Sequence, residues 1–165
     1  MNAASLVALV SALAAIVAAL AARRQAKLRQ AEINLVRAQQ LAKLSDTVRD
    51  IRINFQMASI AWQVKMVAKY NKTVDVLNAL IAEYNSNSIL TLALTRNTKF
   101  AGLHSEIVDA LNEMNKLTSG MVKNMGSGFF SYKLDVEFQK KNSEWLREFD
   151  EKVKQLRRLT VQLTR

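Results

Sequence analysis

The amino-acid sequence predicts an all-α protein in three parts: a single N-terminal transmembrane helix, a long coiled-coil stalk continuous with it, and an antiparallel three-helix bundle. The chain of 165 residues contains no proline and only four glycines, the residues that most often interrupt helices. Apolar side chains recur at three- and four-residue spacing over most of the chain, as they do on helices that pack together. A stretch of apolar or small residues, Ala3 to Ala22, precedes the first charged residue.

Residues 1–22 are expected to form the membrane anchor, because about 20 helical residues span the roughly 30 Å core of a bilayer. The side chains assigned to lipid contact are Leu6, Leu9, Val10, Leu13, Ile16, Val17 and Leu20. No basic residue precedes this stretch, whereas Arg23, Arg24, Lys27 and Arg29 follow it and are assigned to lipid headgroups or phosphate. The positive-inside rule then predicts a single-pass membrane protein with its N-terminus outside and its C-terminal domain in the cytoplasm or inside a virion.

Two other interpretations of this stretch stay open. Ala19-Leu20-Ala21 fits the cleavage site of a secretory signal, although arginines follow it directly. The ten alanines of the stretch add little hydrophobicity, so it also suits a helix that is buried against copies of itself in a soluble assembly. Small residues let helices approach closely. A self-association or partner surface is therefore assigned to Ala8, Ala12, Ala15, Ala19, Ala31 and Ala38.

Residues 23–44 are expected to form a basic helical stalk rich in alanine and glutamine, within one long helix that continues to about Asn85. The apolar seam of the stalk is thin and includes alanines, so other chains are expected to cover it, either copies of this chain or another helical membrane protein. From Leu41 onward the seam consists mostly of large apolar side chains at three- and four-residue spacing, which predicts a packed core. Its residues are Leu41, Leu44, Val48, Ile51, Phe55, Ala58 and Trp62.

Residues 45–165 are expected to form the bundle, with turns near 85–88 and 126–128. The first turn is indicated by Asn85-Ser86-Asn87-Ser88 and the second by two glycines in three residues. The segment 89–95 alternates like a strand, but it is predicted to be helical because no other segment could pair with it. The acidic residues Glu106, Asp109 and Glu113 of the middle helix are expected near basic positions such as Arg49, Arg52 and Lys65.

Residues that could carry catalysis or bind a metal are scarce. The chain has no cysteine and only one histidine, so its composition excludes metal sites built from clusters of Cys and His. The single histidine, His104, is interpreted as a partly exposed helical residue. No glycine-rich phosphate loop follows a strand. The chain is therefore expected to be no enzyme and to have no cofactor, no metal and no small-molecule substrate. Phe129 and Phe130, beside the glycine pair, are interpreted as a plug at the end of the bundle or as a partner surface.

The net charge of +10 is concentrated in residues 23–72, where eleven basic residues stand against three acidic ones. The expected partners are membrane lipid, copies of this chain or another helical membrane protein, and non-specific nucleic acid. The favoured function is an oligomeric scaffold or tether within a larger assembly. A sensor ectodomain is disfavoured because no second span leads to an output domain.

The alternative function is that of a structural protein of a phage or virion. In layout the chain resembles two classes of phage protein: inner-membrane spanins, which place a coiled coil after an N-terminal anchor, and the small ejection proteins of short-tailed phages. A spanin would need the opposite orientation in the membrane. The resemblance implies a basic helical part that faces nucleic acid or the cell envelope.

Overall fold

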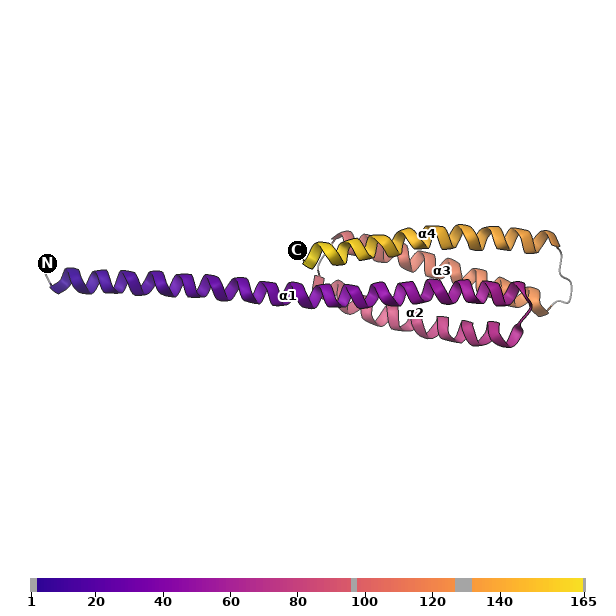
Figure 1. The fold of residues 1–165 in the computed structure, drawn as a ribbon, viewed down its shortest axis with the longest axis horizontal. Coiled ribbons are helices and arrows are strands. Elements are labelled where there is room, and N and C mark those ends of the chain that lie inside the picture. The colour runs from indigo at the N-terminus through magenta and orange to yellow at the C-terminus, as the bar shows by residue number, and fades with distance from the viewer. Residues whose placement is uncertain (1–2, 96–97, 127–131, 165) are drawn as a thin grey trace. The chain divides into compact units, whose positions relative to one another are not determined.

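Four helices make up the part of the chain that the structure, a computed structural model, describes: residues 3–95, 98–126 and 132–164, with side chains in 10–93, 98–122 and 136–162. The helices are α1 (Ala3–Gln63), α2 (Val67–Thr95), α3 (Thr98–Gly126) and α4 (Tyr132–Thr164), as Figure 1 shows. No strand occurs in these ranges, so the prediction of an all-α fold is confirmed for them, segment 89–95 included. The chain divides into two compact units, the first ending at Val36 and the second beginning at Arg37.

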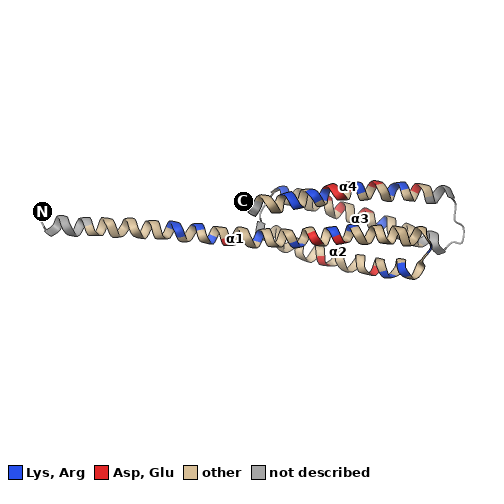
Figure 2. Ribbon diagram, in the orientation of Figure 1, with Lys and Arg blue, Asp and Glu red and all other residues tan. Residues whose placement is uncertain are grey.

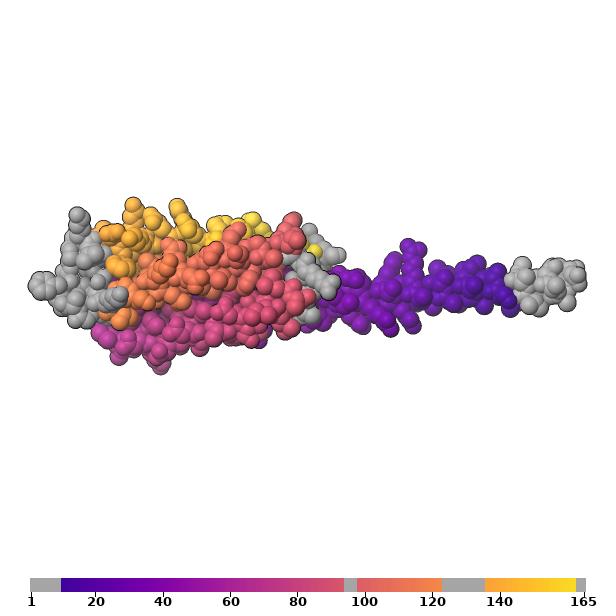
Figure 3. All heavy atoms as spheres, turned by 180° about the vertical axis from the view of Figure 1, so that it is seen from behind, coloured from indigo at the N-terminus to yellow at the C-terminus, as the bar shows by residue number. Residues whose placement is uncertain are grey.

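The second unit is a bundle of four antiparallel helices, not the predicted three. Each helix contacts two neighbours, and early residues of one helix meet late residues of the next, which is the antiparallel sense (Figure 1). The contacts that define this order are Lys43–Glu83, Tyr70–Thr118, Tyr84–His104, Glu106–Lys152, Ala110–Trp145, Arg52–Asp150 and Ser59–Asn142. Figure 3 shows the face on which α2, α3 and α4 lie side by side.

The fourth helix exists because α1 ends at Gln63, where the sequence predicted an unbroken helix. Lys65 has a positive φ of 57°. The amide of Lys65 donates to the carbonyl of Trp62 at 3.0 Å, and the amide of Met66 donates to that of Ala61 at 2.8 Å. These two bonds form a Schellman cap, which usually has glycine in the left-handed position. Since lysine occupies that position here, neither glycine nor proline marks the break.

The turn predicted at 85–88 is wrong, because α2 continues through it to Thr95. The polar residues there are satisfied inside the helix: the Ser88 hydroxyl donates to the carbonyl of Asn85 at 3.0 Å, and that of Thr91 to the carbonyl of Asn87 at 2.8 Å. Both side chains are almost fully buried. The second turn was predicted near 126–128, and α3 does end at Gly126, while residues 127–131 lie outside the described ranges.

The core of the bundle includes the apolar seam that the spacing identified in α1. All seven seam residues from Leu41 to Trp62 are buried. Trp145 of α4 lies between two other aromatic rings, with its ring centre 4.4 Å from that of Phe55 and 4.4 Å from that of Phe149. Its indole N–H donates to the carbonyl of Ala110 at 2.8 Å, so one side chain joins α1, α3 and α4.

The prediction of a single-pass membrane protein, N-terminus outside and C-terminal domain in the cytoplasm, is wrong. Across the residues that the structure describes, no helix carries an apolar run long enough to cross a membrane. The described side chains of the expected anchor explain this result. Seven of the thirteen residues from Val10 to Ala22 are alanine, which contributes little hydropathy, and the basic residues Arg23, Arg24 and Lys27 follow at once.

Candidate functional site

The first candidate site is the part of α1 from Val10 to Val36, which we call the uncovered segment. Its side chains are exposed, apart from a partly exposed Asn34. Among them are nine large hydrophobic side chains with 46% to 65% of their surface exposed. They are Val10, Leu13, Ile16, Val17, Leu20, Leu28, Ile33, Leu35 and Val36. Isolated helices are marginally stable in water, and this one buries none of its large apolar side chains within the chain.

The residues assigned to self-association divide into three groups. Ala12, Ala15, Ala19 and Ala31 are exposed in the uncovered segment. The assignment is wrong for Ala38, which is buried in the second unit with 3% exposure and is therefore not on a free surface. The side chains of Ala8, Phe129 and Phe130, and those of the anchor residues Leu6 and Leu9, lie outside the described residues.

The basic residues Arg23, Arg24, Lys27 and Arg29 are all exposed. Within the described part of the chain none of them has an ion-pair partner, and Glu32 is the one acidic residue of the uncovered segment. Figure 2 shows the basic residues of α1 along its length. The segment therefore combines apolar residues with an unpaired positive charge.

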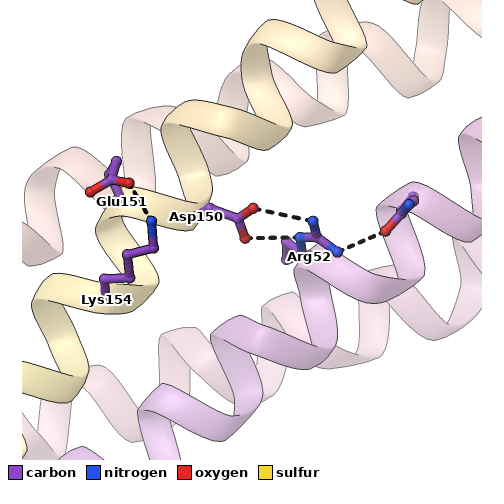
Figure 4. Close-up of polar contacts among 5 residues, drawn as sticks. Arg52, Asp150, Glu151 and Lys154 are labelled. Carbon is purple, nitrogen blue, oxygen red and sulfur yellow. Dashed lines mark hydrogen bonds and ion pairs between the residues drawn. The ribbon is translucent and has the colours of Figure 1, made fainter.

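A bidentate ion pair joins the first and last helices of the bundle. The Arg52 Nε donates to Asp150 Oδ1 at 2.9 Å and Arg52 Nη2 donates to Asp150 Oδ2 at 3.1 Å, while Nη1 donates to Gln56 at 2.7 Å (Figure 4). The expectation that Arg52 and Glu106 would be neighbours is wrong. Because α1 and α3 are diagonal in a four-helix bundle, Glu106 instead accepts a hydrogen bond from Lys152 of α4 at 3.0 Å.

His104 lies half-buried between α2 and α3. The Tyr84 hydroxyl is 2.9 Å from His104 Nδ1. Burial lowers the pKa of His104 below its ordinary value of 6.5, so the ring is neutral at pH 7. In the tautomer that carries its proton on Nε2, Nδ1 accepts a hydrogen bond from the Tyr84 hydroxyl. Burial also raises the pKa of Tyr70 to about 12, and its hydroxyl donates to the carbonyl of Thr118 at 2.8 Å. These groups hold α2 against α3.

Two open grooves flank the C-terminal part of α4. One, of about 280 Å³, lies between α1 and α4 and is lined by Ala42, Ser45, Asp46, Arg157, Thr160 and Val161. The other, of about 210 Å³, lies between α3 and α4 and is lined by Lys99, Leu103, Gln155, Arg158, Leu159 and Gln162. Among the described residues, no three His, Asp or Glu side chains are grouped closely enough to hold a metal ion.

The second candidate site was missed by the sequence analysis. It is a row of apolar side chains that we call the outer stripe: Ile53, Met57 and Ile60 on the outer face of α1, and Val64 directly after the end of that helix. These side chains are 42% to 58% exposed. Their four- and three-residue spacing was available in the sequence, as was the absence of charge from Ile53 to Val64. The sequence analysis assigned only the core seam of the same helix, which has more and larger apolar residues.

Comparison with protein-family models, with curated proteins and with solved structures found no match.

Proposed function

We propose that this chain is a non-enzymatic scaffold or tether, held in a larger assembly by other helices that pack on the uncovered segment. The observation that carries this proposal is the exposure of nine large hydrophobic side chains on one helical segment. Soluble monomers rarely expose so large an apolar surface, and such surfaces are usually interaction sites.

Coiled-coil association of copies of this chain suits the pattern of the segment. Val10, Leu13, Val17 and Leu20 follow each other at spacings of three, four and three residues, which is the repeat of a coiled-coil seam. The same repeat places Arg24 and Lys27 at the next two seam positions, before Ala31, so the uninterrupted apolar part of the seam ends at Leu20. Small residues beside this seam let helix backbones approach closely, which supports a compact contact.

The test is the mass of the full chain in solution, measured by light scattering during gel filtration. We expect a discrete oligomer, and we expect Leu13→Glu with Leu20→Glu to reduce its mass, because two carboxylates would then lie in the seam. Arg29→Glu is the matched control, since Arg29 lies on the opposite face of the helix by its 100° rotation per residue. A monomeric parent chain, or an oligomer that both variants leave unchanged, would refute self-association through this segment.

A second candidate function is a structural component of a virion, whose basic helical segment faces nucleic acid. It is favoured by a cluster of four exposed basic residues between positions 23 and 29, which have no ion-pair partner among the described residues. They are Arg23, Arg24, Lys27 and Arg29. Contacts of four basic residues with phosphates would give sequence-independent binding that weakens steeply with salt.

This candidate is tested by measuring binding to a duplex DNA of random sequence at several salt concentrations. If all four residues contact phosphates, log K should fall with log salt at a slope of about −3.6. Arg23→Gln with Arg24→Gln should reduce that slope by about half. Lys140→Gln with Lys141→Gln, in the exposed part of α4, is the control. Equal losses in the two variants would indicate non-specific attraction to the net charge and refute the assignment.

A further inference from the structure

We propose that two copies of this chain, joined through the uncovered segment, bind a small phosphate-bearing anion between Arg24 and Lys27 of each copy. The inference rests on the self-association proposed above. The site is incomplete in a single chain, because half of its cations come from the second copy. It concerns the part of the seam that follows Leu20, where charged residues take the place of apolar ones.

Arg24 lies within the apolar face of the uncovered segment. It stands four residues after Leu20 and four residues before Leu28, and side chains four residues apart lie on the same face of a helix. Leu20, Leu28 and Leu35 are all more than half exposed, so apolar side chains are available for contact before and after Arg24. A second copy that packs on this face therefore covers Arg24 as well.

The uncovered segment supplies no counter-charge for these seam positions. Arg24 and Lys27 are exposed, and neither has an ion-pair partner among the described residues. Glu32, the one acidic residue of the segment, lies about 12 Å along the helix axis from Arg24 and about 80° around it. Removing a cation from water without a partner is strongly unfavourable, so a covered Arg24 needs an anion from outside the chain.

The apolar part of the seam favours two parallel copies. From Val10 to Leu20 the seam residues alternate between valine and leucine, and this alternation favours two strands in parallel coiled coils. In a parallel pair, each layer of the seam contains the same residue from both copies. The two Arg24 side chains therefore meet in one layer, and the two Lys27 side chains meet about 4.5 Å further along the axis.

Four cations within about one helical turn match a small anion that carries several negative charges. The planar guanidinium of arginine donates two parallel hydrogen bonds to a phosphate group, and the ammonium of lysine adds a point charge with further donors. Arg23, which precedes Arg24 and is also exposed without an ion-pair partner among the described residues, adds one more positive charge per copy at the edge of the contact. A monovalent anion such as chloride would neutralise less of this charge.

Sedimentation of the full chain in sodium pyrophosphate tests the proposal, with sodium chloride at matched ionic strength as the reference. An anion that binds the pair but not the separate copies strengthens association by a factor that grows with its concentration. The factor is about elevenfold when pyrophosphate is present at ten times its own Kd. In that range the Kd of the dimer should fall in proportion to the pyrophosphate concentration, as expected for one anion per pair.

Paired substitutions locate the site. Arg24→Gln with Lys27→Gln should abolish the difference between pyrophosphate and chloride. Arg29→Gln with Lys69→Gln is the matched control: it removes the same charge from two exposed residues, and Arg29 lies about 140° around the helix from Arg24. Arg24→Leu with Lys27→Leu should strengthen the dimer in chloride at least tenfold, because charged seam residues cost stability in a coiled coil.

Disulfide formation by single cysteines fixes the orientation, since the chain has no cysteine of its own. Val10→Cys and Ala31→Cys lie at equivalent positions of the seven-residue repeat, about 32 Å apart along the helix. Only a parallel pair brings each of the two positions next to its own copy. Both single variants should therefore form disulfide-linked dimers under oxidising conditions.

The outcomes separate this site from the function on which it rests. A chain that stays monomeric in both salts would refute the self-association, and the site with it. A dimer of equal strength in pyrophosphate and chloride would overturn the anion site alone. An equal loss of the pyrophosphate effect in the seam variant and in the control would also overturn it, by indicating attraction to the net charge. Disulfides that form only in a mixture of Val10→Cys and Ala31→Cys would indicate an antiparallel pair, in which the two Arg24 layers do not meet.

Discussion

Substitution of glycine by alanine is expected to change the stability of the chain in opposite directions at Gly120 and Gly102 of α3. A Cβ added at Gly120 would lie 2.7 Å from the Cζ atom of Phe138, whereas a Cβ at Gly102 would meet no atom within 4 Å. Both glycines are helical, so alanine at either site gains about 0.5–1 kcal/mol of stability by limiting the freedom of the unfolded chain. Only Gly120→Ala must also displace an aromatic ring.

The ring of Phe138, which is partly buried, would have to shift to admit that methyl group. A shift would disturb its contact with Trp62, whose ring centre is 5.7 Å away. Overpacking of this kind typically costs about 1–3 kcal/mol. After the gain in helix propensity is subtracted, Gly120→Ala should destabilise the chain by about 1 kcal/mol, and Gly102→Ala should stabilise it by up to about 1 kcal/mol.

Urea unfolding followed by the fluorescence of the buried tryptophans measures both changes from the shift of the midpoint. The two variants should move the midpoint in opposite directions. Phe138→Leu combined with Gly120→Ala should then be less destabilising than the sum of the two single changes, because the shorter side chain leaves room for the methyl group. If the two alanine variants shift the midpoint equally and in the same direction, the close approach of α3 to α4 is refuted.

Three further outcomes are expected for the bundle. Lys65→Gly should raise stability by about 1 kcal/mol in thermal unfolding, since glycine adopts the left-handed conformation without steric cost, and no change would contradict the cap. Arg52→Ala and Asp150→Ala should show a coupling energy of about 0.5–1 kcal/mol in a double-mutant cycle at low salt, and strictly additive effects would argue against the ion pair. Burial lowers the pKa of His104 below 6.5, so protonation favours the unfolded chain. Its contribution to stability is therefore full above pH 6.5 and falls as the pH drops below that value, and His104→Gln should flatten the stability profile there, which unfolding midpoints measured from pH 7 to pH 5 would test.

The sequence predicted the core of the bundle well, because burial follows helical periodicity. The spacing from Leu41 to Trp62 identified inward-facing side chains without any knowledge of their partners. Gly126, where α3 ends, was recognisable because glycine is the usual residue at a helix terminus. These features depend on local chemistry, which a sequence shows directly.

The number of helices could not be predicted by the same reasoning. The cap at Lys65 depends on backbone hydrogen bonds that leave no compositional signal, and the polar run at 85–88 gave a turn signal that the helix satisfied internally. Because the sequence predicted one helix where the structure has α1 and α2, α3 was expected beside α1, and Arg52 was expected near the wrong acidic residues. The length of the first apolar stretch was readable from the sequence, whereas among the described residues no helix is long and apolar enough to cross a membrane.

The ion pair between Arg52 and Asp150 closes the bundle across a sequence separation of 98 residues. In a growing chain, the face of α1 that packs on α4 is therefore made long before the helix that covers it. At a synthesis rate of roughly 5–20 residues per second, the delay is about 5–20 s. During biosynthesis the face of α1 that packs on α4 therefore stays uncovered for that time, and a chain truncated before Asn142 would lack the α4 residues that cover it.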